Sequence, residues 1–253
     1  MTFFKTGVAL FFLCGLATAA SAGSATVYAT QDAMIFATSG GSDTGNASGM
    51  GPGMFAGADG QGNKKRTVLT FDLASAGIPG NATIDSVTMT LIVGQTAGYG
   101  GAGCNSNCSY PSRTIRVYHL NTAWNEGTSG SPTSTSIGGT GQGYSIVSGD
   151  TSWRYTNYSG SQWTSLGGDY NATEIASSTF GPTFPLGMTC TWSSAGMVTD
   201  VQNWLANSST YKGWLIKSDL ETSSTSFLGW WTKDGAAANS NPALRPKLEI
   251  AWH

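Results

Sequence analysis

The chain has 253 residues, of which only 10% are charged, and its formal net charge is −2 with a pI near 5.6. This charge provides no cationic field for a phosphate backbone, so we expect no nucleic-acid partner. The 35 glycines and the scarcity of Lys and Glu argue against a helical protein and favour short strands joined by many polar turns.

The first residues have the pattern of an export signal. A single lysine precedes the apolar run Gly7–Leu16, and small residues follow, including Ala20-Ser21-Ala22. We therefore predict a signal peptide over residues 1–22 and one domain over 23–253, although cleavage after Ala19 fits nearly as well. The apolar run is too short to span a bilayer permanently and no second one follows, so we expect a secreted, extracellular product without a membrane anchor.

The rest of the chain predicts an all-β, antiparallel β-sandwich with long end loops and one short helix. Apolar and polar residues alternate with period two, as in half-buried strands: Leu69, Phe71 and Leu73 share one face of a strand. A second strand would bury Val87, Met89, Leu91 and Val93, and the last would bury Leu248, Ile250 and Trp252. Further strands are expected at Ala25–Thr30, Asp32–Ala37, Thr114–Leu120, Lys212–Lys217, Phe227–Lys233 and Lys247–Trp252.

The remaining segments have no strand-like alternation. Ala195–Leu205 has helical spacing of its apolar residues and is the one helix we expect. Ser39–Asn63 and Ala97–Ser112 are rich in Gly, Ser and Asn and are predicted to be loops. Gly127–Thr191 is too aromatic for a disordered linker, so it is predicted to add strands or an ordered lid.

Three cysteines follow the signal segment, an odd number for an oxidising compartment. Cys104 and Cys108 flank a three-residue loop and could close a local disulfide, which would leave Cys190 free and buried. Alternatively, Cys190 pairs with one of them. No histidine lies near enough in sequence to indicate zinc.

Catalytic signals are few. His119 follows Ile115 and Val117 on one face of a strand, a position typical of a hydrogen-bonded structural histidine. Glu126, close to Trp124, is the acid that a glycosidase could use, but a structural role explains it as well. We expect no enzyme and no cofactor, with calcium left open because Asp32, Asp43 and Asp59 lie in or beside the first long loop.

The order of several sequence blocks resembles the DNRLRE family. These blocks are KRTVLTFDLASAGIPGNATIDSVTMTLIV, TIRVYHLNTAWNEG, TSW, DVQNWL, GWLIKSD and RPKLEI, and they cover nearly the whole chain after the signal segment. The resemblance implies a jelly-roll-like sandwich of the kind found on secreted bacterial and archaeal proteins. It also implies carbohydrate binding, since related modules are classed among carbohydrate-binding modules.

The chain has more aromatic residues than a core of this size needs, with nine Trp and nine Tyr. Trp204, Trp214 and Trp252 have aliphatic neighbours and are expected in the core. Trp230 and Trp231 must point to opposite faces of a strand, so one is core and the other is exposed or covered by a loop. The candidate ligand-binding residues are Trp163, Tyr155, Tyr158, Tyr170 and Trp192, with one of the pair Trp230 and Trp231.

Three functions are compatible with these patterns. The first is a secreted, non-catalytic carbohydrate-binding protein whose partner is an extracellular or cell-surface polysaccharide. The second is a structural subunit of a surface layer, filament or biofilm matrix, which implies self-association. The third is a polysaccharide-degrading enzyme that uses Glu126.

Overall fold

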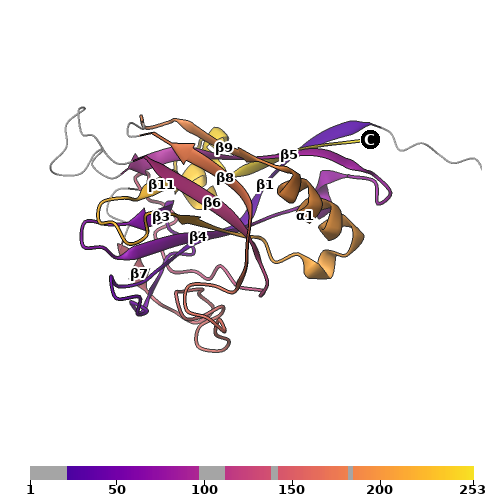
Figure 1. Cartoon of the computed structure of the whole chain (residues 1–253). Coiled ribbons are helices and arrows are strands. Elements are labelled where there is room, and N and C mark those ends of the chain that lie inside the picture. Colours follow the sequence, from indigo (N-terminus) through magenta and orange to yellow (C-terminus); the bar gives the residue numbers. More distant parts are fainter. Residues whose placement is uncertain (1–21, 97–111, 138–141, 182–184) are drawn as a thin grey trace, which may run out of the picture.

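The computed structural model describes residues 22–96, 112–137, 142–181 and 185–253 (Figure 1). The signal segment before Ala22 and the pair Cys104 and Cys108 lie outside these residues. The strands are β1 (Gly23–Phe36), β2 (Asn46–Ala47), β3 (Gly53–Ala58), β4 (Lys64–Phe71), β5 (Ile84–Thr96), β6 (Arg113–Leu120), β7 (Tyr144–Ser145), β8 (Tyr170–Phe180), β9 (Thr189–Ser193), β10 (Trp214–Ser218), β11 (Leu228–Trp231) and β12 (Lys247–Trp252). The helices are α1 (Ala195–Ala206) and α2 (Lys233–Ala238), with short 3-10 turns at Ala74–Ala76, Ser208–Thr210 and Pro242–Leu244.

The strands form an antiparallel β-sandwich, as predicted. One layer contains β9, β5, β12 and the first half of β1; the other contains the second half of β1, then β4, β10, β6 and β8. β1 changes partner along its length: Gly23–Tyr28 pairs with β12, and the remainder, from Ala29 on, pairs with β4, with a register irregularity between Ala29 and Gln31. β11 and β3 connect the layers on the other side, because β11 pairs with β5 and β3 pairs with β4.

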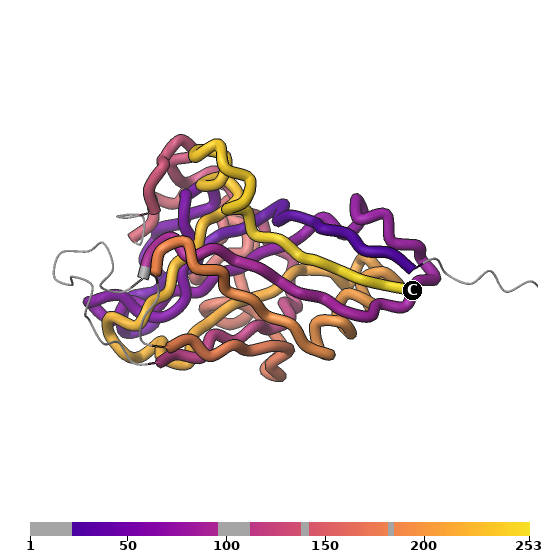
Figure 2. The backbone as a smooth tube through the Cα atoms, turned by 90° about the horizontal axis from the view of Figure 1, so that it is seen from above, coloured from indigo at the N-terminus to yellow at the C-terminus, as the bar shows by residue number. Residues whose placement is uncertain are grey.

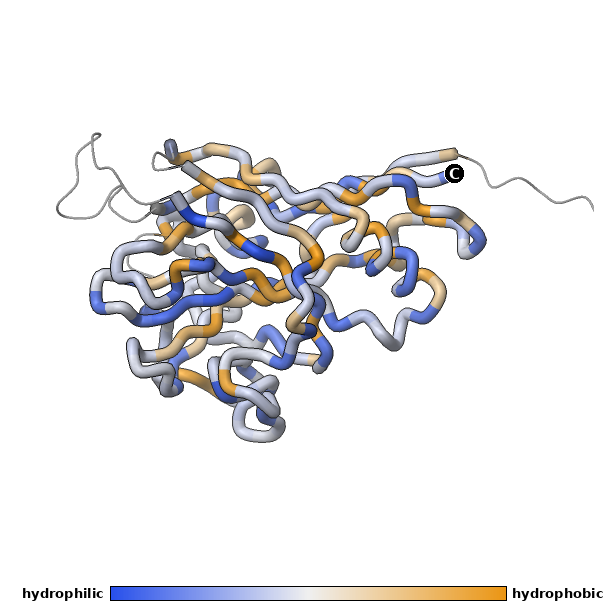
Figure 3. The backbone as a smooth tube through the Cα atoms, viewed as in Figure 1, coloured by the Kyte–Doolittle hydropathy of each residue, from blue (hydrophilic) through white to orange (hydrophobic). Residues whose placement is uncertain are grey.

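The main core lies between the two layers. The predicted inward residues of β5 and β12 are buried there, and they meet Ile115 and Val117 of β6 and Trp214 and Ile216 of β10. Apolar segments run along these strands in Figure 3. Helix α1 is capped by Ser194, whose side chain accepts a hydrogen bond from the backbone N–H of Met197. The helix adds Met197, Val201 and Trp204 to the core. The predicted helix is therefore confirmed.

A second apolar cluster covers the outer face of the β1–β4–β10–β6 layer. Val68 and Leu215 point away from the main core, and they are covered by Trp124, Trp153 and Trp163 from the segment that joins β6 to β8. In Figure 1 this segment lies below β4 and carries β7. The prediction that Gly127–Thr191 contributes strands or an ordered lid is thus confirmed, since it supplies β7, β8, the first part of β9 and this cover.

Two sequence predictions were wrong. Ser39–Asn63, predicted to be a loop, contains β3, and all six residues of that strand are buried. Its sequence GMFAGA does not alternate because both of its faces are covered. The predicted strand Phe227–Lys233 ends at Trp231, and a second helix, α2, begins after Thr232, whose hydroxyl accepts a hydrogen bond from the N–H of Gly235.

The long strands extend beyond the rest of the molecule at the end that carries the carboxyl terminus. Figure 2 shows β1, β12 and part of β5 running side by side toward this end, in agreement with their pairing. The segment between β6 and β8 lies toward the other end of β1, where the second half of that strand pairs with β4. The candidate site lies on this side of the molecule.

Candidate groove at Tyr170

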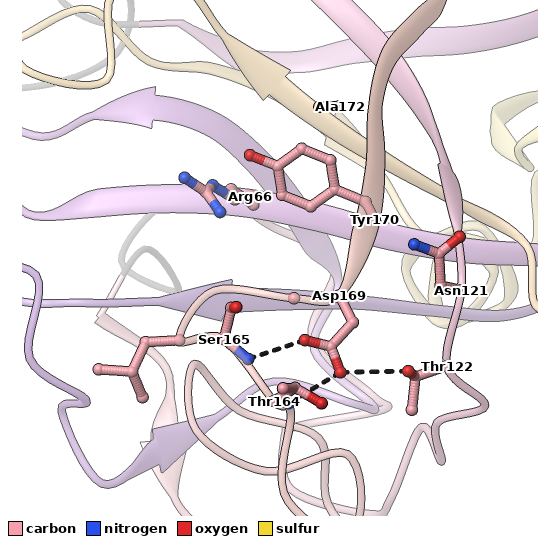
Figure 4. Close-up of a pocket in the computed structure, with 10 residues that line it drawn as sticks. Arg66, Asn121, Thr122, Thr164, Ser165, Asp169, Tyr170 and Ala172 are labelled. Carbon is pink, nitrogen blue, oxygen red and sulfur yellow. Dashed lines mark hydrogen bonds between the residues drawn. The ribbon is translucent and has the colours of Figure 1, made fainter.

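An open groove lies where β8 begins, beside the segment that covers the second cluster. Its volume is about 600 Å³. The groove is lined by Arg66 of β4, Asn121 and Thr122 after β6, and the segment that leads into β8, namely Thr164, Ser165, Leu166, Gly168, Asp169, Tyr170 and Ala172. Polar groups therefore surround one aromatic ring, that of Tyr170 (Figure 4).

The ring of Tyr170 is half-buried and is held from several sides. Its centroid lies 5.0 Å from that of Tyr118, which packs in the second cluster. The Nζ of Lys217 donates a hydrogen bond to its hydroxyl at 3.3 Å, and the guanidinium of Arg66 lies 5.6 Å from the ring centroid. These contacts fix the ring while part of it stays accessible in the groove.

Asp169 organises the segment before Tyr170. Its carboxylate accepts the backbone N–H groups of Thr164 and Ser165, both at 2.8 Å, and the hydroxyl of Thr122 at 3.1 Å (Figure 4). Burial opposes ionisation here, but these hydrogen bonds outweigh it and hold the pKa of Asp169 below its ordinary value. The carboxylate thus ties the loop after β6 to the loop before β8.

Arg66 lines the groove beside Tyr170 and is itself held by several contacts (Figure 4). Its Nε and Nη2 donate to the two carboxylate oxygens of Glu221 at 2.7 and 2.9 Å, and its Nη1 donates to the carbonyl of Gly167 at 2.7 Å. The guanidinium also lies 4.6 Å from the ring centroid of Trp153. A bidentate pair combined with stacking is the geometry that arginine provides and lysine does not. Arg66 therefore connects β4 to Glu221 and to the segment that leads into β8.

The structure places the predicted ligand residues in four different locations. Tyr170 lines the groove, whereas Trp163 lies in the second cluster with 5% of its surface exposed and donates its Nε1–H to the carbonyl of Ser152 at 2.9 Å. Tyr155 and Tyr158 are half-buried and pack edge to face, with centroids 5.0 Å apart. They do not line the groove.

Trp192 and Trp230 are placed in the main core, with 1% and 0% of their surface exposed. Their ring centroids lie 5.9 Å apart, and neither ring has a face that a ligand could reach. The neighbour of Trp230 on β11, Trp231, is half-buried and packs against the same core. Three of the predicted ligand-binding residues, Trp163, Trp192 and Trp230, are therefore packing residues in this structure, because their rings are buried.

Cys190 is buried, and among the residues that the structure describes it is a free cysteine. Burial raises the pKa of this thiol to about 11, so it is protonated at neutral pH and inert as a nucleophile.

His119 is held as a structural histidine would be. Its Nδ1 lies 3.1 Å from Asp200 Oδ2, which also accepts the indole N–H of Trp214 at 2.8 Å. The imidazole packs beside Trp204, with ring centroids 5.9 Å apart. These contacts explain why the histidine occupies this strand position.

Glu126 belongs to a cluster of carboxylates that lies apart from the groove. Its Oε1 accepts the backbone N–H of Asp32 at 2.8 Å, and its Oε2 pairs with the ammonium of Lys233 at 2.9 Å. Burial, reinforced by the mutual repulsion of the carboxylates, raises the pKa of Asp32 to about 8; burial raises that of Glu126 to about 7. A general acid needs such a pKa, but Asp32 is fully buried and cannot touch a substrate.

No protein-family model matches the chain, and no curated protein matches it significantly. The resemblance to the DNRLRE family therefore stays a prediction, and a function has to be inferred from the groove itself. In the described part of the chain, no helix is long and apolar enough to cross a bilayer.

Proposed function

We propose that this protein is an exported, non-catalytic polysaccharide-binding protein and that its ligand occupies the groove at Tyr170. The observation that carries the proposal is a partly accessible tyrosine ring, fixed at the start of a strand and surrounded by side chains that form hydrogen bonds. A sugar ring offers an apolar C–H face and a rim of hydroxyls. Its face can pack on the tyrosine while the hydroxyls are bound by groups such as the Asn121 amide and the Ser165 hydroxyl.

The groove is suited to recognition because its parts are fixed before a ligand arrives. Asp169 and Arg66 join three separate segments around Tyr170 through hydrogen bonds of 2.7 to 3.1 Å. Binding then requires little ordering of loops, which lowers the entropic cost of association. The volume of about 600 Å³ also falls within the usual range of roughly 300–1,000 Å³ for small-ligand sites.

The charges around the groove favour a neutral or weakly acidic glycan. Arg66 and Asp169 are the charged residues that line it, and each is already bound to groups of the protein. Lys217, beside the Tyr170 hydroxyl, lies 3.6 Å from a carboxylate oxygen of Glu221. Affinity should therefore depend only weakly on salt, because few unpaired charges take part.

Affinity electrophoresis in gels that contain a panel of neutral and acidic polysaccharides tests the proposal. We expect Tyr170→Leu to abolish the retardation seen with the wild-type protein, and Tyr170→Phe to keep most of it because the ring face remains. Tyr28→Leu is the matched control, since Tyr28 is a 39% exposed tyrosine on β1 that lies outside the groove. Retardation that is unchanged in Tyr170→Leu, or absent for every polysaccharide, would contradict the proposal.

Self-association is the second candidate function, and one feature favours it. β8 is the last strand of its layer in the described residues, where β6 is its pairing partner, and its eleven residues are mostly Asn, Thr, Ser and Ala. Such an edge can pair with the edge of another chain. Light scattering over a concentration series measures this directly: a mass that stays at one chain at high concentration argues against a filament or layer subunit.

A further inference from the structure

Three carboxylates from distant parts of the sequence meet at one point. Asp32 lies on β1, Glu126 in the loop after β6, and Asp234 in the first turn of α2. One carboxylate oxygen from each lies within 4.8 Å of the others. We call this group the acidic cluster; none of its members lines the groove at Tyr170.

Asp32 is the buried centre of the acidic cluster. Its side chain is fully buried, and its Oδ2 accepts the backbone N–H of Lys233 at 2.8 Å. Its Oδ1 is equally inaccessible but has no hydrogen-bond partner among the described residues. A buried carboxylate oxygen without a hydrogen-bond donor lowers the stability of the folded state, so a ligand that binds this atom would be stabilising.

One ammonium group does not balance the three carboxylates. The Nζ of Lys233 lies 2.9 Å from Glu126 Oε2 and 2.7 Å from Asp234 Oδ2. Three negative charges against one positive charge leave two negative charges when all groups are ionised. Arg245 lines the neighbouring pocket, but its guanidinium stacks over Tyr28 at 4.8 Å. A divalent cation would supply the missing charge.

We propose that the acidic cluster is a calcium-binding site, with Asp32, Glu126 and Asp234 as its protein ligands. Calcium binds oxygen atoms at roughly 2.3–2.6 Å, so two oxygens on one ion lie at most about 5 Å apart, which the cluster satisfies. The three ligands are all carboxylates, a set that suits a hard cation and not zinc or copper. An adjacent pocket of about 500 Å³, lined by Lys233 and Asp234, gives the ion and its water ligands a path from solvent.

Lys233 is then an internal competitor of the ion. Its side chain is 19% exposed and lines the same pocket, so its ammonium can move outward when calcium takes the carboxylates. The bound ion would connect β1, the loop after β6 and α2. Because calcium would bind only the folded chain, it should raise the melting temperature, and the gain in the free energy of unfolding should grow with the logarithm of one plus the ratio of the calcium concentration to Kd.

Isothermal titration of the chelator-treated protein with calcium chloride, up to about 10 mM because extracellular sites bind at roughly 0.1–1 mM, tests the proposal. We expect one ion per chain and a rise in Tm with calcium. Asp32→Asn and Glu126→Gln should each weaken binding by at least about tenfold, the scale on which ligand-shell changes act. Asp85→Asn is the control: Asp85 is an exposed carboxylate paired with His253 and should leave calcium binding unchanged.

Lys233→Gln tests the same site in the opposite direction. Removal of the competing ammonium should tighten calcium binding, and calcium should raise the Tm of this variant more than that of the wild-type protein. The proposal is overturned if no calcium binds at 10 mM, or if binding survives both carboxylate substitutions unchanged. It is also overturned if Lys233→Gln shows no gain, an outcome that remains readable even if Asp32→Asn does not fold.

Discussion

Trp163 distinguishes a packing role from a binding role for the aromatic residues of the segment between β6 and β8. Its ring is 5% exposed and its Nε1–H donates to the Ser152 carbonyl at 2.9 Å. Trp163→Phe removes this donor from a buried carbonyl and leaves a small cavity beside Trp153. We expect a loss of about 2–4 kcal/mol in the free energy of unfolding, from the unpaired carbonyl and the lost volume together.

Two measurements on the same protein check this prediction. In a domain of this size about 1 kcal/mol shifts Tm by roughly 2–4 °C, so calorimetry should show a decrease of about 4–16 °C. Retardation by polysaccharide, measured well below the new Tm, should match that of the wild-type protein because the Tyr170 ring is unchanged. Unaltered stability combined with lost retardation would show that Trp163 contacts the ligand, and the packing assignment would be refuted.

Two further predictions concern buried charges. Lys65→Met should lower the free energy of unfolding by about 2–4 kcal/mol, because it removes the cation that lies 3.0 Å from a carboxylate oxygen of the buried Asp59. Lys64→Met on the same strand should be nearly neutral, and equal effects of the two substitutions in urea denaturation would contradict this prediction. In chelator, stability should fall as pH rises from about 5 to about 8. The raised pKa values of Asp32 and Glu126 mean that the folded state holds more protons than the unfolded state in this range. Asp32→Asn should flatten the profile, and a wild-type profile that rises with pH would refute the assignment.

The alternation of apolar and polar residues in the sequence predicted those strands that have one apolar and one polar face. Leu248, Ile250 and Trp252 face the core as expected, and the predicted bounds of the last strand agree with those of β12. The same logic missed β3, because a strand with both faces covered has no alternation to detect. It also missed α2, whose six residues are too few to show a helical period.

The candidate site could be predicted only in part. Surplus aromatic residues indicated the segment between β6 and β8 and included Tyr170, but composition does not show which rings are covered. Trp163 and Tyr170 are only seven residues apart but differ in exposure: Trp163 is buried in the second cluster, whereas Tyr170, at the start of β8, is only half-buried. The sequence analysis missed Asn121 and Asp169, because they come together only through the pairing of β6 with β8. The one local signal in the sequence is the Gly-Gly-Asp segment before Tyr170, which is typical of a turn.

Residues of β4 contribute to the main core, to the second cluster and to the groove. Leu69 points into the main core, Val68 into the second cluster, and Arg66, two residues earlier on the same face as Val68, supports the groove. The outer face of this layer would otherwise be exposed apolar surface, so the segment between β6 and β8 must cover it for the sandwich to remain soluble. Since that cover also holds Asp169 and leads into Tyr170, the same packing that protects the sheet fixes the ring that we propose binds the glycan.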